Sequence, residues 1–367
     1  MDDELYWNCD VEKCEYWDLD VEFATSTEIA ESRTEVCDEC GFGSVYSAIW
    51  QDGQIRGWDI NDQNWIRVGI QSVALKTINN PIDPISDILK EIESNIEVVD
   101  DPHFIRCLGI TQDSKTNNYM IVMEYATSGS LRAYMNANNM DADEKGRILW
   151  SISKGLYNLH EKNLIHQDFH PGNLLLINGF LSISDFGLCK QENQKSTTEK
   201  IFGVLPYVAP EVLCGEEYTK ASDVYSFSIV AWELITGYPP YHNIPHDSGL
   251  ALQICRGKRP KIPSNVPKIM ARLIEECWDA DPKKRPTSKQ LFTIINKWLM
   301  SSAFDKFILP TSILPSYKLH SKAIYTSRAF NSTGSKPSNA STFRTMYSKG
   351  NNLFNIIIYL IQYNTNL

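Results

Sequence analysis

Two polar motifs in the middle of the chain have the residue types that a chemical reaction would use. The chain reads His-Gln-Asp-Phe-His-Pro-Gly-Asn at 166–173, and twelve residues after Asn173 it reads Asp185-Phe186-Gly187. The Asp168 carboxylate could accept a proton from a hydroxyl, and Asn173 and Asp185 could hold Mg²⁺ on a nucleoside triphosphate. Phosphoryl transfer from ATP needs this combination, because the protein must position the acceptor, the phosphates and the metal that neutralises the spreading charge.

Other motifs that could position these residues follow one another in a fixed order. The earlier ones are Phe42-Gly43-Ser44-Val45, Val73-Ala74-Leu75-Lys76 and the acidic stretch Ile88-Leu89-Lys90-Glu91-Ile92-Glu93, and the later ones are Ala209-Pro210-Glu211, Asp223-Val224-Tyr225-Ser226-Phe227 and Arg285-Pro286. With this set the chain resembles the eukaryotic protein kinases, within them the tyrosine-kinase-like group and serine/threonine-type kinases of fungi, over roughly residues 35–299. The resemblance implies a two-lobed α+β fold, with a small antiparallel β lobe and a larger helical lobe.

The resemblance assigns a role to one lysine. Lys76 would reach the α- and β-phosphates of ATP while Glu91 holds it forward, with Glu93 as the alternative partner. A lone Val-Ala-Leu-Lys is more often an exposed strand lysine. Because Asp168 and Asp185 are also present, we interpret Lys76, Glu91 and Asp168 as catalytic residues, with Asp168 as the base.

The resemblance also implies a site for ATP. Its residues would be Gly43, Val45, Ala74, Lys76, Met123, Glu124, Ala126 and Leu175. The side chains of Val45, Ala74 and Leu175 would sandwich the adenine ring, and Met123 would lie at the back. Backbone groups of Glu124 and Ala126 would hydrogen-bond the edge of the ring.

The phosphate-binding loop departs from the family's three-glycine pattern. Gly43 fills the third glycine position, whereas Asp38 stands at the first and Cys40 at the second. Glycines let backbone N–H groups approach phosphate closely, so a side chain at Cys40 would crowd the loop. Asp38 would place a negative charge near the triphosphate. We therefore expect weaker ATP binding than in a kinase with all three glycines.

Two residues of the catalytic motif also depart from the family pattern. Many relatives carry an arginine at the position of Gln167, where it pairs with a phosphate on the activation segment. Gln167 cannot make that charge-assisted pair, so we expect phosphorylation at Ser196, Thr197 or Thr198 not to act as the on-switch. His170 replaces the lysine that is usual in serine/threonine kinases, which predicts reduced turnover or a pH-sensitive rate.

Three further residues of the motifs are interpreted as structural. Glu211 and Arg285 would form a buried ion pair that stabilises the large lobe. Asp223 would cap its helix and hold the backbone of the catalytic loop. Replacing these residues should affect folding more than chemistry.

Composition divides the chain into three parts. Residues 1–40 hold fourteen acidic and two basic residues, and 1–33 are interpreted as an acidic N-terminal extension. The kinase-like region at 34–299 would divide into a small lobe at 34–126 and a large lobe at 127–299. Residues 300–367 are rich in Ser, Thr and Asn and are expected to be a disordered tail.

Periodicity places the secondary structure within this frame. Strand-like runs lie at 44–50, 70–78, 104–111 and 119–125, and the polar stretch 51–67 is longer than a simple hairpin loop. Helices are predicted at about 85–99, 148–159, 223–236, 247–256, 267–278 and 288–299.

Bulk properties favour some classes of protein over others. The net charge is −10 and no basic patch occurs, so no nucleic-acid partner is expected. The longest apolar run, 353–363, is shorter than the roughly twenty residues that cross a bilayer. It is expected to be an edge strand or a sticky tail rather than a membrane span. The start of the chain has no secretory pattern, and the odd number of cysteines, nine, suits reduced thiols in the cytoplasm, with the nucleus also possible.

The sequence thus predicts a kinase that uses ATP and Mg²⁺ and transfers phosphate to serine or threonine hydroxyls of protein substrates. Two alternatives stay open: a pseudokinase or signalling scaffold with weak or no ATP turnover, and a tyrosine or dual-specificity kinase. The altered residues Asp38, Cys40 and His170 favour the scaffold, whereas Lys76 and Asp168 favour the enzyme. The oligomeric state is not predicted.

Overall fold

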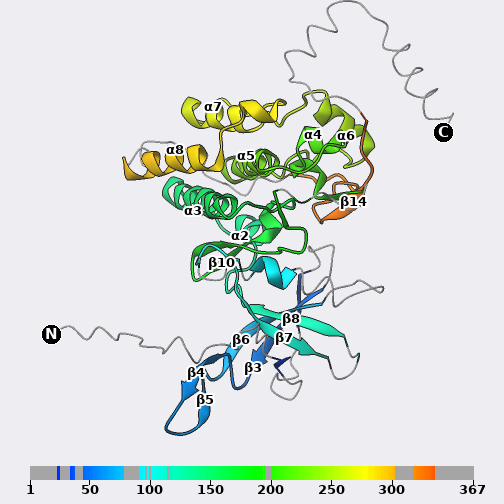
Figure 1. Cartoon of the computed structure of the whole chain (residues 1–367). Coiled ribbons are helices and arrows are strands. Elements are labelled where there is room, and N and C mark those ends of the chain that lie inside the picture. The colour runs from blue at the N-terminus through cyan, green and yellow to red at the C-terminus, as the bar shows by residue number, and fades with distance from the viewer. Residues whose placement is uncertain are drawn as a thin grey trace, which may run out of the picture.

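The chain folds into a small lobe built on a β-sheet and a large lobe built mainly of helices (Figure 1). The computed structural model describes residues 44–77, 91–95, 97–98, 101–113, 116, 118–192, 194, 200–301 and 317–334, together with the strands at 23–24 and 34–37. Asp38, Cys40, Gly43, the hydroxyls at 196–198 and the apolar run 353–363 lie outside the described residues. The two-lobed α+β fold predicted from the sequence is confirmed.

The small lobe contains a six-stranded sheet with the strand order β1-β7-β8-β6-β3-β2. Its strands are β1 (Phe23–Ala24), β2 (Thr34–Cys37), β3 (Val45–Trp50), β6 (Gln71–Thr77), β7 (Cys107–Gln112) and β8 (Tyr119–Glu124). Neighbouring strands are antiparallel except for β1 and β7, which are parallel. Strand β6 lies between β3 and β8, and its residues 73–76 are buried, with Val73 and Leu75 in one hydrophobic cluster and Ala74 in another. Residues 91–95 are helical, inside the helix predicted at 85–99.

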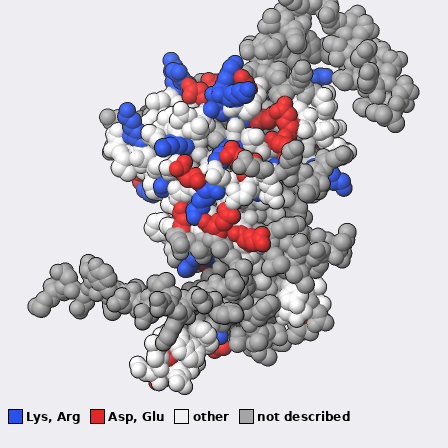
Figure 2. Space-filling view, in the orientation of Figure 1, with Lys and Arg blue, Asp and Glu red and all other residues white. Residues whose placement is uncertain are grey.

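The polar stretch between β3 and β6 is itself a hairpin rather than an irregular loop. It consists of β4 (Ile55–Asp59) and β5 (Asn64–Arg67), which pair as a separate two-stranded sheet. The rings of Trp58 and Trp65 meet edge to face with 4.8 Å between centroids. In the orientation of Figure 2, the described residues of this hairpin present a mostly uncharged surface, whereas the large lobe shows acidic and basic residues interspersed.

The large lobe contains the helices α2 (Leu131–Ala137), α3 (Ala142–Glu161), α4 (Pro210–Leu213), α5 (Lys220–Thr236), α6 (Ser248–Cys255), α7 (Lys268–Cys277) and α8 (Ser288–Met300). The polar motifs lie in loops between short strands, which are β9 (Leu164–Ile165), β10 (Leu174–Ile177), β11 (Phe180–Ile183), β12 (Lys190–Gln191) and β13 (Ile201–Gly203). Among the described residues, no helix combines the length and the apolar character that a membrane crossing requires.

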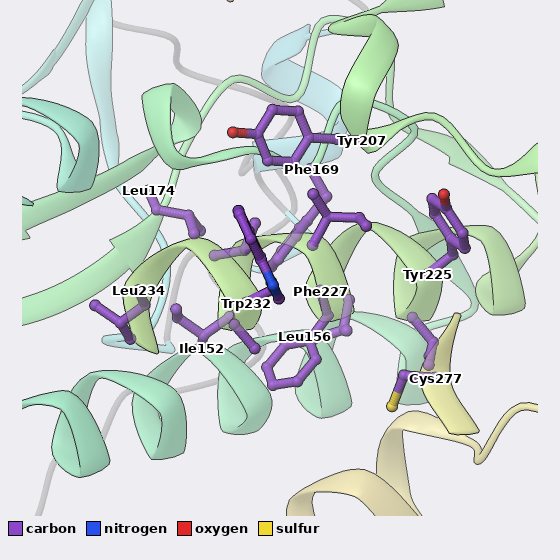
Figure 3. Packing of buried hydrophobic residues seen from close by; sticks show 14 of the residues in the cluster. Ile152, Leu156, Phe169, Leu174, Tyr207, Tyr225, Phe227, Trp232, Leu234 and Cys277 are labelled. Atoms are coloured by element: carbon purple, nitrogen blue, oxygen red, sulfur yellow. The ribbon is translucent and has the colours of Figure 1, made fainter. Parts of the chain in front are cut away.

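Helix α5 is the centre of the large lobe. Every residue from 222 to 236 is buried, and its side chains pack against α3 and α7 in one hydrophobic core (Figure 3). Figure 3 shows Ile152 and Leu156 of α3 facing Phe227 and Leu234 of α5. Burial of such side chains stabilises the folded state by about 25 cal/mol per Å² of apolar surface removed from water. The loops attached to α3 and α5 are therefore held by a stable core.

The ends of α5 explain its length and correct one expectation. Thr219 is the N-cap: its side chain accepts from the Ser222 amide, while the Ser222 hydroxyl closes a capping box. Gly237 ends the helix with φ = 74°, a left-handed conformation that glycine adopts at low cost. The prediction that Asp223 caps the helix is therefore wrong, because the helix begins one turn earlier, at Lys220.

Part of the C-terminal region is folded onto the large lobe, in contrast to the predicted disorder. Residues 317–334 lie along the side of the lobe that carries α4 and α6 (orange in Figure 1). They include β14 (Arg328–Phe330), which pairs antiparallel with β13. The prediction was wrong for this segment because its Ser- and Thr-rich composition hid a strand that forms only against a distant partner.

A buried ion pair joins α4 to the segment just before α8, as predicted. The guanidinium of Arg285 donates to both carboxylate oxygens of Glu211, over 2.7 and 2.6 Å. Arg285 also donates to the carbonyls of Asp279 and Ala221. The two paired side chains are 0% and 2% exposed, so each charge depends on the other for its stabilisation.

We therefore expect Glu211→Ala to lower the free energy of unfolding by about 3–5 kcal/mol, because it leaves the Arg285 charge buried without its partner. The matched control is Asp143→Ala, which breaks the exposed pair with Arg147 on α3 and should cost no more than about 0.5 kcal/mol. Urea unfolding followed by tryptophan fluorescence measures both. Equal losses in the two variants would contradict the structural role of Glu211.

Candidate active site

Lys76 lies where the two lobes meet and contacts two carboxylates at once. Its Nζ donates to Glu91 Oε1 and Oε2 over 2.7 and 2.9 Å, and to Asp185 Oδ1 over 2.7 Å. The side chain of Lys76 is only 3% exposed. Burial alone would lower the pKa of Lys76, but the carboxylates of Asp185 and Glu91 raise it above its usual value, so the ammonium stays charged. Of the two candidates from the sequence, Glu91 and not Glu93 makes the contact.

The catalytic motif and the Asp-Phe-Gly motif are bonded to each other. Asn173 donates its side-chain amide to the Asp168 carbonyl over 3.0 Å and to Asp168 Oδ2 over 3.4 Å. The carbonyl of Asn173 accepts from both the amide and the hydroxyl of Ser184, over 2.9 and 3.0 Å. His166 Nε2 contacts the Ser184 carbonyl over 3.0 Å. These bonds bring Asp168, Asn173 and Asp185 together in one small region.

Asp185 has an unusual backbone conformation that aims its side chain. Its φ is 64°, a left-handed value that is uncommon for residues other than glycine. The next residue, Phe186, is buried against Phe104 and His166, with ring centroids 5.8 and 5.7 Å away. At Gly187 a Cβ atom would lie 3.2 Å from Glu91 Oε2, so the absence of a side chain lets this turn approach Lys76 and its partners.

Helix α5 holds the catalytic loop through Asp223, as predicted. The Asp223 carboxylate accepts from the backbone amides of His166 and Gln167, over 2.9 and 3.1 Å, and contacts His160 Nε2 over 3.0 Å. Gln167 has φ = 69°, and the bond to its amide supports this conformation. The loop is thus fixed to the most buried helix of the large lobe.

His170 lies beside Asp168 instead of projecting away from it. Its Nδ1 accepts from the Gly172 amide over 3.0 Å, and its Nε2 lies 3.5 Å from Asp168 Oδ2. Burial raises the pKa of the Asp168 carboxyl, but His170, His166 and the Ser327 hydroxyl lower it more, so the net shift is downward. The site therefore favours an ionised Asp168, which is the form that accepts a proton.

The apolar residues predicted to hold the adenine ring lie together between the lobes. Val45, Ala74, Met123 and Leu175 belong to one hydrophobic cluster. Ala74 pairs with Met123 across β6 and β8.

Some of the backbone groups predicted to hydrogen-bond the edge of the adenine ring already form hydrogen bonds within the protein. The Glu124 amide donates to the Arg106 carbonyl over 3.1 Å, and the Ala126 carbonyl accepts from the Gly129 amide over 3.1 Å. The groups left for the edge of a base are therefore the Glu124 carbonyl and the Ala126 amide. Gly43 lies outside the described residues, so its predicted contact stays a prediction.

Sequence reasoning missed one polar residue at this site. Ser327, from the C-terminal segment, is 4% exposed and close to Asp168. A serine in a stretch rich in Ser, Thr and Asn carries no local signal that would have identified it. Only the pairing of β14 with β13 brings it to the site.

The bonds to Asp223 lead to a test. Asp223→Ala leaves the amides of His166 and Gln167 buried without an acceptor, so we expect hydrogen exchange at these two amides to rise by about 10-fold or more. Lys220→Ala, on the first turn of the same helix, is the control, because its ammonium contacts Glu192 and Asn163 and no amide of this loop. Unchanged protection at both amides in Asp223→Ala would contradict the role assigned to this carboxylate.

Comparison with known proteins agrees with this geometry. The family model described as protein tyrosine and serine/threonine kinase matches residues 32–295. A probable serine/threonine-protein kinase of Dictyostelium discoideum is 30% identical over 240 residues, covering 62% of this chain and 18% of the relative. Mitogen-activated protein kinase kinase kinase 10 of Xenopus laevis is 29% identical over 298 residues, covering 74% and 27%.

A serine/threonine/tyrosine-protein kinase of Arabidopsis thaliana is 32% identical over 184 residues, covering 49% of this chain and 47% of the relative. The chain spans less than a third of the length of the Dictyostelium and Xenopus relatives. The family match covers more than half of the chain, in the region that contains both lobes and the polar site. The chain therefore belongs to the protein tyrosine and serine/threonine kinase family.

Proposed function

We propose that the chain is an ATP- and Mg²⁺-dependent protein kinase that transfers the γ-phosphate to serine or threonine hydroxyls of protein substrates. The observation that carries the proposal is the triple contact of Lys76 Nζ with Glu91 and Asp185, beside a catalytic loop that presents Asp168 and Asn173. The curated relatives described above are named as serine/threonine or serine/threonine/tyrosine kinases, which supports this acceptor class.

In this proposal each residue of the site has one task. Lys76, held by Glu91, binds the α- and β-phosphates, and Asp168 accepts the proton of the acceptor hydroxyl. The Glu124 carbonyl and the Ala126 amide meet the edge of adenine, and Val45, Ala74, Leu175 and Met123 enclose the ring. Gly43 would contribute its backbone to the phosphate loop.

The donor atoms suit magnesium. Asn173 uses its side-chain nitrogen to bond Asp168, which leaves its carboxamide oxygen, and Asp185 Oδ1 is paired with Lys76, which leaves Oδ2. Two oxygen ligands together with phosphate oxygens are what Mg²⁺ prefers. When bound, the ion would neutralise charge that spreads over the phosphates during transfer.

The rival function, a scaffold without turnover, is not proposed. Of the three altered residues that favour it, Asp38 and Cys40 lie outside the described residues, and His170 is outweighed by the four polar side chains that transfer requires, which are present and close together. We also propose a cytoplasmic or nuclear location, since Cys107, Cys189 and Cys277 are free thiols.

The test is transfer of labelled phosphate from Mg-ATP to a generic protein substrate by the full chain, beside Asp168→Asn and Lys76→Met. We expect the parent to label serine and threonine, and each variant to be slower by about 10²-fold or more, because a base or a phosphate-positioning charge is lost. Thermal stabilisation by Mg-ATP separates the two variants: Asp168→Asn should retain it and Lys76→Met should lose most of it. Transfer at the parental rate by Asp168→Asn would refute the assignment of the base.

A further inference from the structure

The C-terminal segment 317–334 adds a strand beside the catalytic loop. In β14, Arg328 lies opposite Gly203, Ala329 opposite Phe202 and Phe330 opposite Ile201. Strand β13 thus receives an extended peptide from the chain's own C-terminal region. Backbone pairing of this kind is a common way for a protein to bind a peptide, because it uses main-chain hydrogen bonds that every sequence offers.

The register of this pairing brings Ser327 to the catalytic base. Gly203, which faces Arg328, is so close to the loop that a Cβ atom on it would lie 3.5 Å from Asp168 Oδ1. Ser327 directly precedes Arg328. The side chain of Ser327 is nine-tenths or more buried, and the Ser327 hydroxyl makes no well-formed hydrogen bond with any described residue. Its place in the chain, one residue before the partner of Gly203, puts the Ser327 hydroxyl beside Asp168.

Contacts before Ser327 hold the segment in place. The ring of Tyr325 lies over the Arg132 guanidinium at 4.7 Å, and its hydroxyl donates to the Pro240 carbonyl over 2.9 Å. The ring of His246 meets Tyr325 edge to face at 4.8 Å, and the His246 amide donates to the Lys322 carbonyl over 2.9 Å.

A contact after Ser327 holds the other end. The Thr333 amide donates to the Leu213 carbonyl over 2.7 Å, at the last residue of α4. The chain is therefore anchored on both sides of Ser327. An anchored, extended strand with one buried hydroxyl next to a base is the geometry expected of a bound acceptor.

We propose that residues 317–334 occupy the binding site for protein substrates and that Ser327 is phosphorylated by its own chain. This inference rests on the proposed kinase function, and it adds the class of substrate that the kinase would phosphorylate first. The acceptor is a serine in an extended strand, followed at once by three residues that pair with β13. A tyrosine at position 327 would carry its hydroxyl far beyond Asp168, because the side chain is a whole ring longer, so this geometry also favours serine.

The reaction balances with ATP as the only co-substrate. The Ser327 oxygen forms a bond to the γ-phosphorus, and the bond from that phosphorus to the β–γ bridging oxygen breaks. ADP leaves with the electron pair, and Asp168 accepts the hydroxyl proton. The product is a phosphoserine with a charge of about −1.5 to −2 at pH 7.

This product would not be tolerated where Ser327 now lies. A phosphate with this charge, in a position as buried as that of Ser327, would lose its hydration. Strand β14 would then leave β13 and free the site. The segment therefore excludes other protein substrates until one phosphate has been transferred to it.

The experiment follows phosphorylation of the full chain by labelled Mg-ATP, with the sites mapped by mass spectrometry. We expect phosphate on Ser327, with a first-order rate constant that is unchanged when the enzyme is diluted, because the acceptor is in the same molecule. Ser327→Ala should abolish this phosphorylation. Thr326→Ala, which removes the neighbouring hydroxyl, should leave it intact. Asp168→Asn should abolish it as well.

A second pair of variants tests occupancy of the site. Tyr325→Ala removes the contacts with Arg132 and Pro240, so it should slow Ser327 phosphorylation by about 10-fold or more and raise the rate on an added substrate peptide. It should also raise hydrogen exchange at the amides of 201–203, a readout that needs no catalysis. Leu319→Ala, in an exposed residue of the same segment, is the control and should change none of these rates.

The outcomes separate this inference from the proposed function. Transfer to a generic substrate without any phosphate on Ser327 would overturn the inference and leave the kinase intact. A Ser327 rate that rises in proportion to enzyme concentration would also overturn it, because the acceptor would then come from another molecule. Absence of transfer to every substrate would overturn both.

Discussion

The site depends on one buried ammonium that two carboxylates share. Lys76 comes from a central strand, Glu91 from a helix fifteen residues later and Asp185 from a loop 109 residues away, and their charged atoms meet within 2.7 to 2.9 Å. Each charge would be costly to bury alone, so the three elements are stable together only in this arrangement. The contact therefore fixes the small lobe against the Asp-Phe-Gly loop and creates the place where a triphosphate could bind.

A second set of hydrogen bonds connects the core of the large lobe to the loop that contains Asp168. Helix α5 is buried along its length, and through Asp223 it holds two amides of the catalytic loop. Asn173 and Ser184 then tie that loop to the start of the Asp-Phe-Gly motif. Because these are short bonds to buried backbone, the geometry of Asp168 is set by packing of the core rather than by the flexible side chains around it.

Sequence reasoning predicted Lys76, Glu91, Asp168, Asn173 and Asp185 as site residues because each belongs to a motif whose spacing reflects its local structure. The structure brings these five residues close together. The same reasoning located β3, β6, β7 and β8 and the helices α3, α5, α6, α7 and α8, since apolar periodicity follows from which face is buried. It did not predict α2 or the short strands β9 to β13.

It failed where structure depends on distant pairing. The position of β14 could not be read from residues 317–334, whose partner lies more than a hundred residues earlier. The start of α5 was misplaced because Thr219 and Ser222 carry the capping signal, whereas the motif drew attention to Asp223.

The sequence showed that His170 departs from the family pattern, but it did not show that the ring lies beside Asp168. That position follows from the local turn in which His170 Nδ1 accepts from the Gly172 amide.

The hairpin between β3 and β6 has a narrow neck, and this neck makes it a separable unit. At Gly53 a Cβ atom would lie only 2.2 Å from the Gly69 carbonyl oxygen, and the Gly69 amide donates to the Asp52 carbonyl over 2.9 Å. The chain thus leaves and re-enters the sheet at nearly one point, and Trp50 stays opposite Gln71 whatever lies beyond. Evolution could lengthen, shorten or exchange this insertion, with its two surface tryptophans, without shifting the strand that carries Lys76.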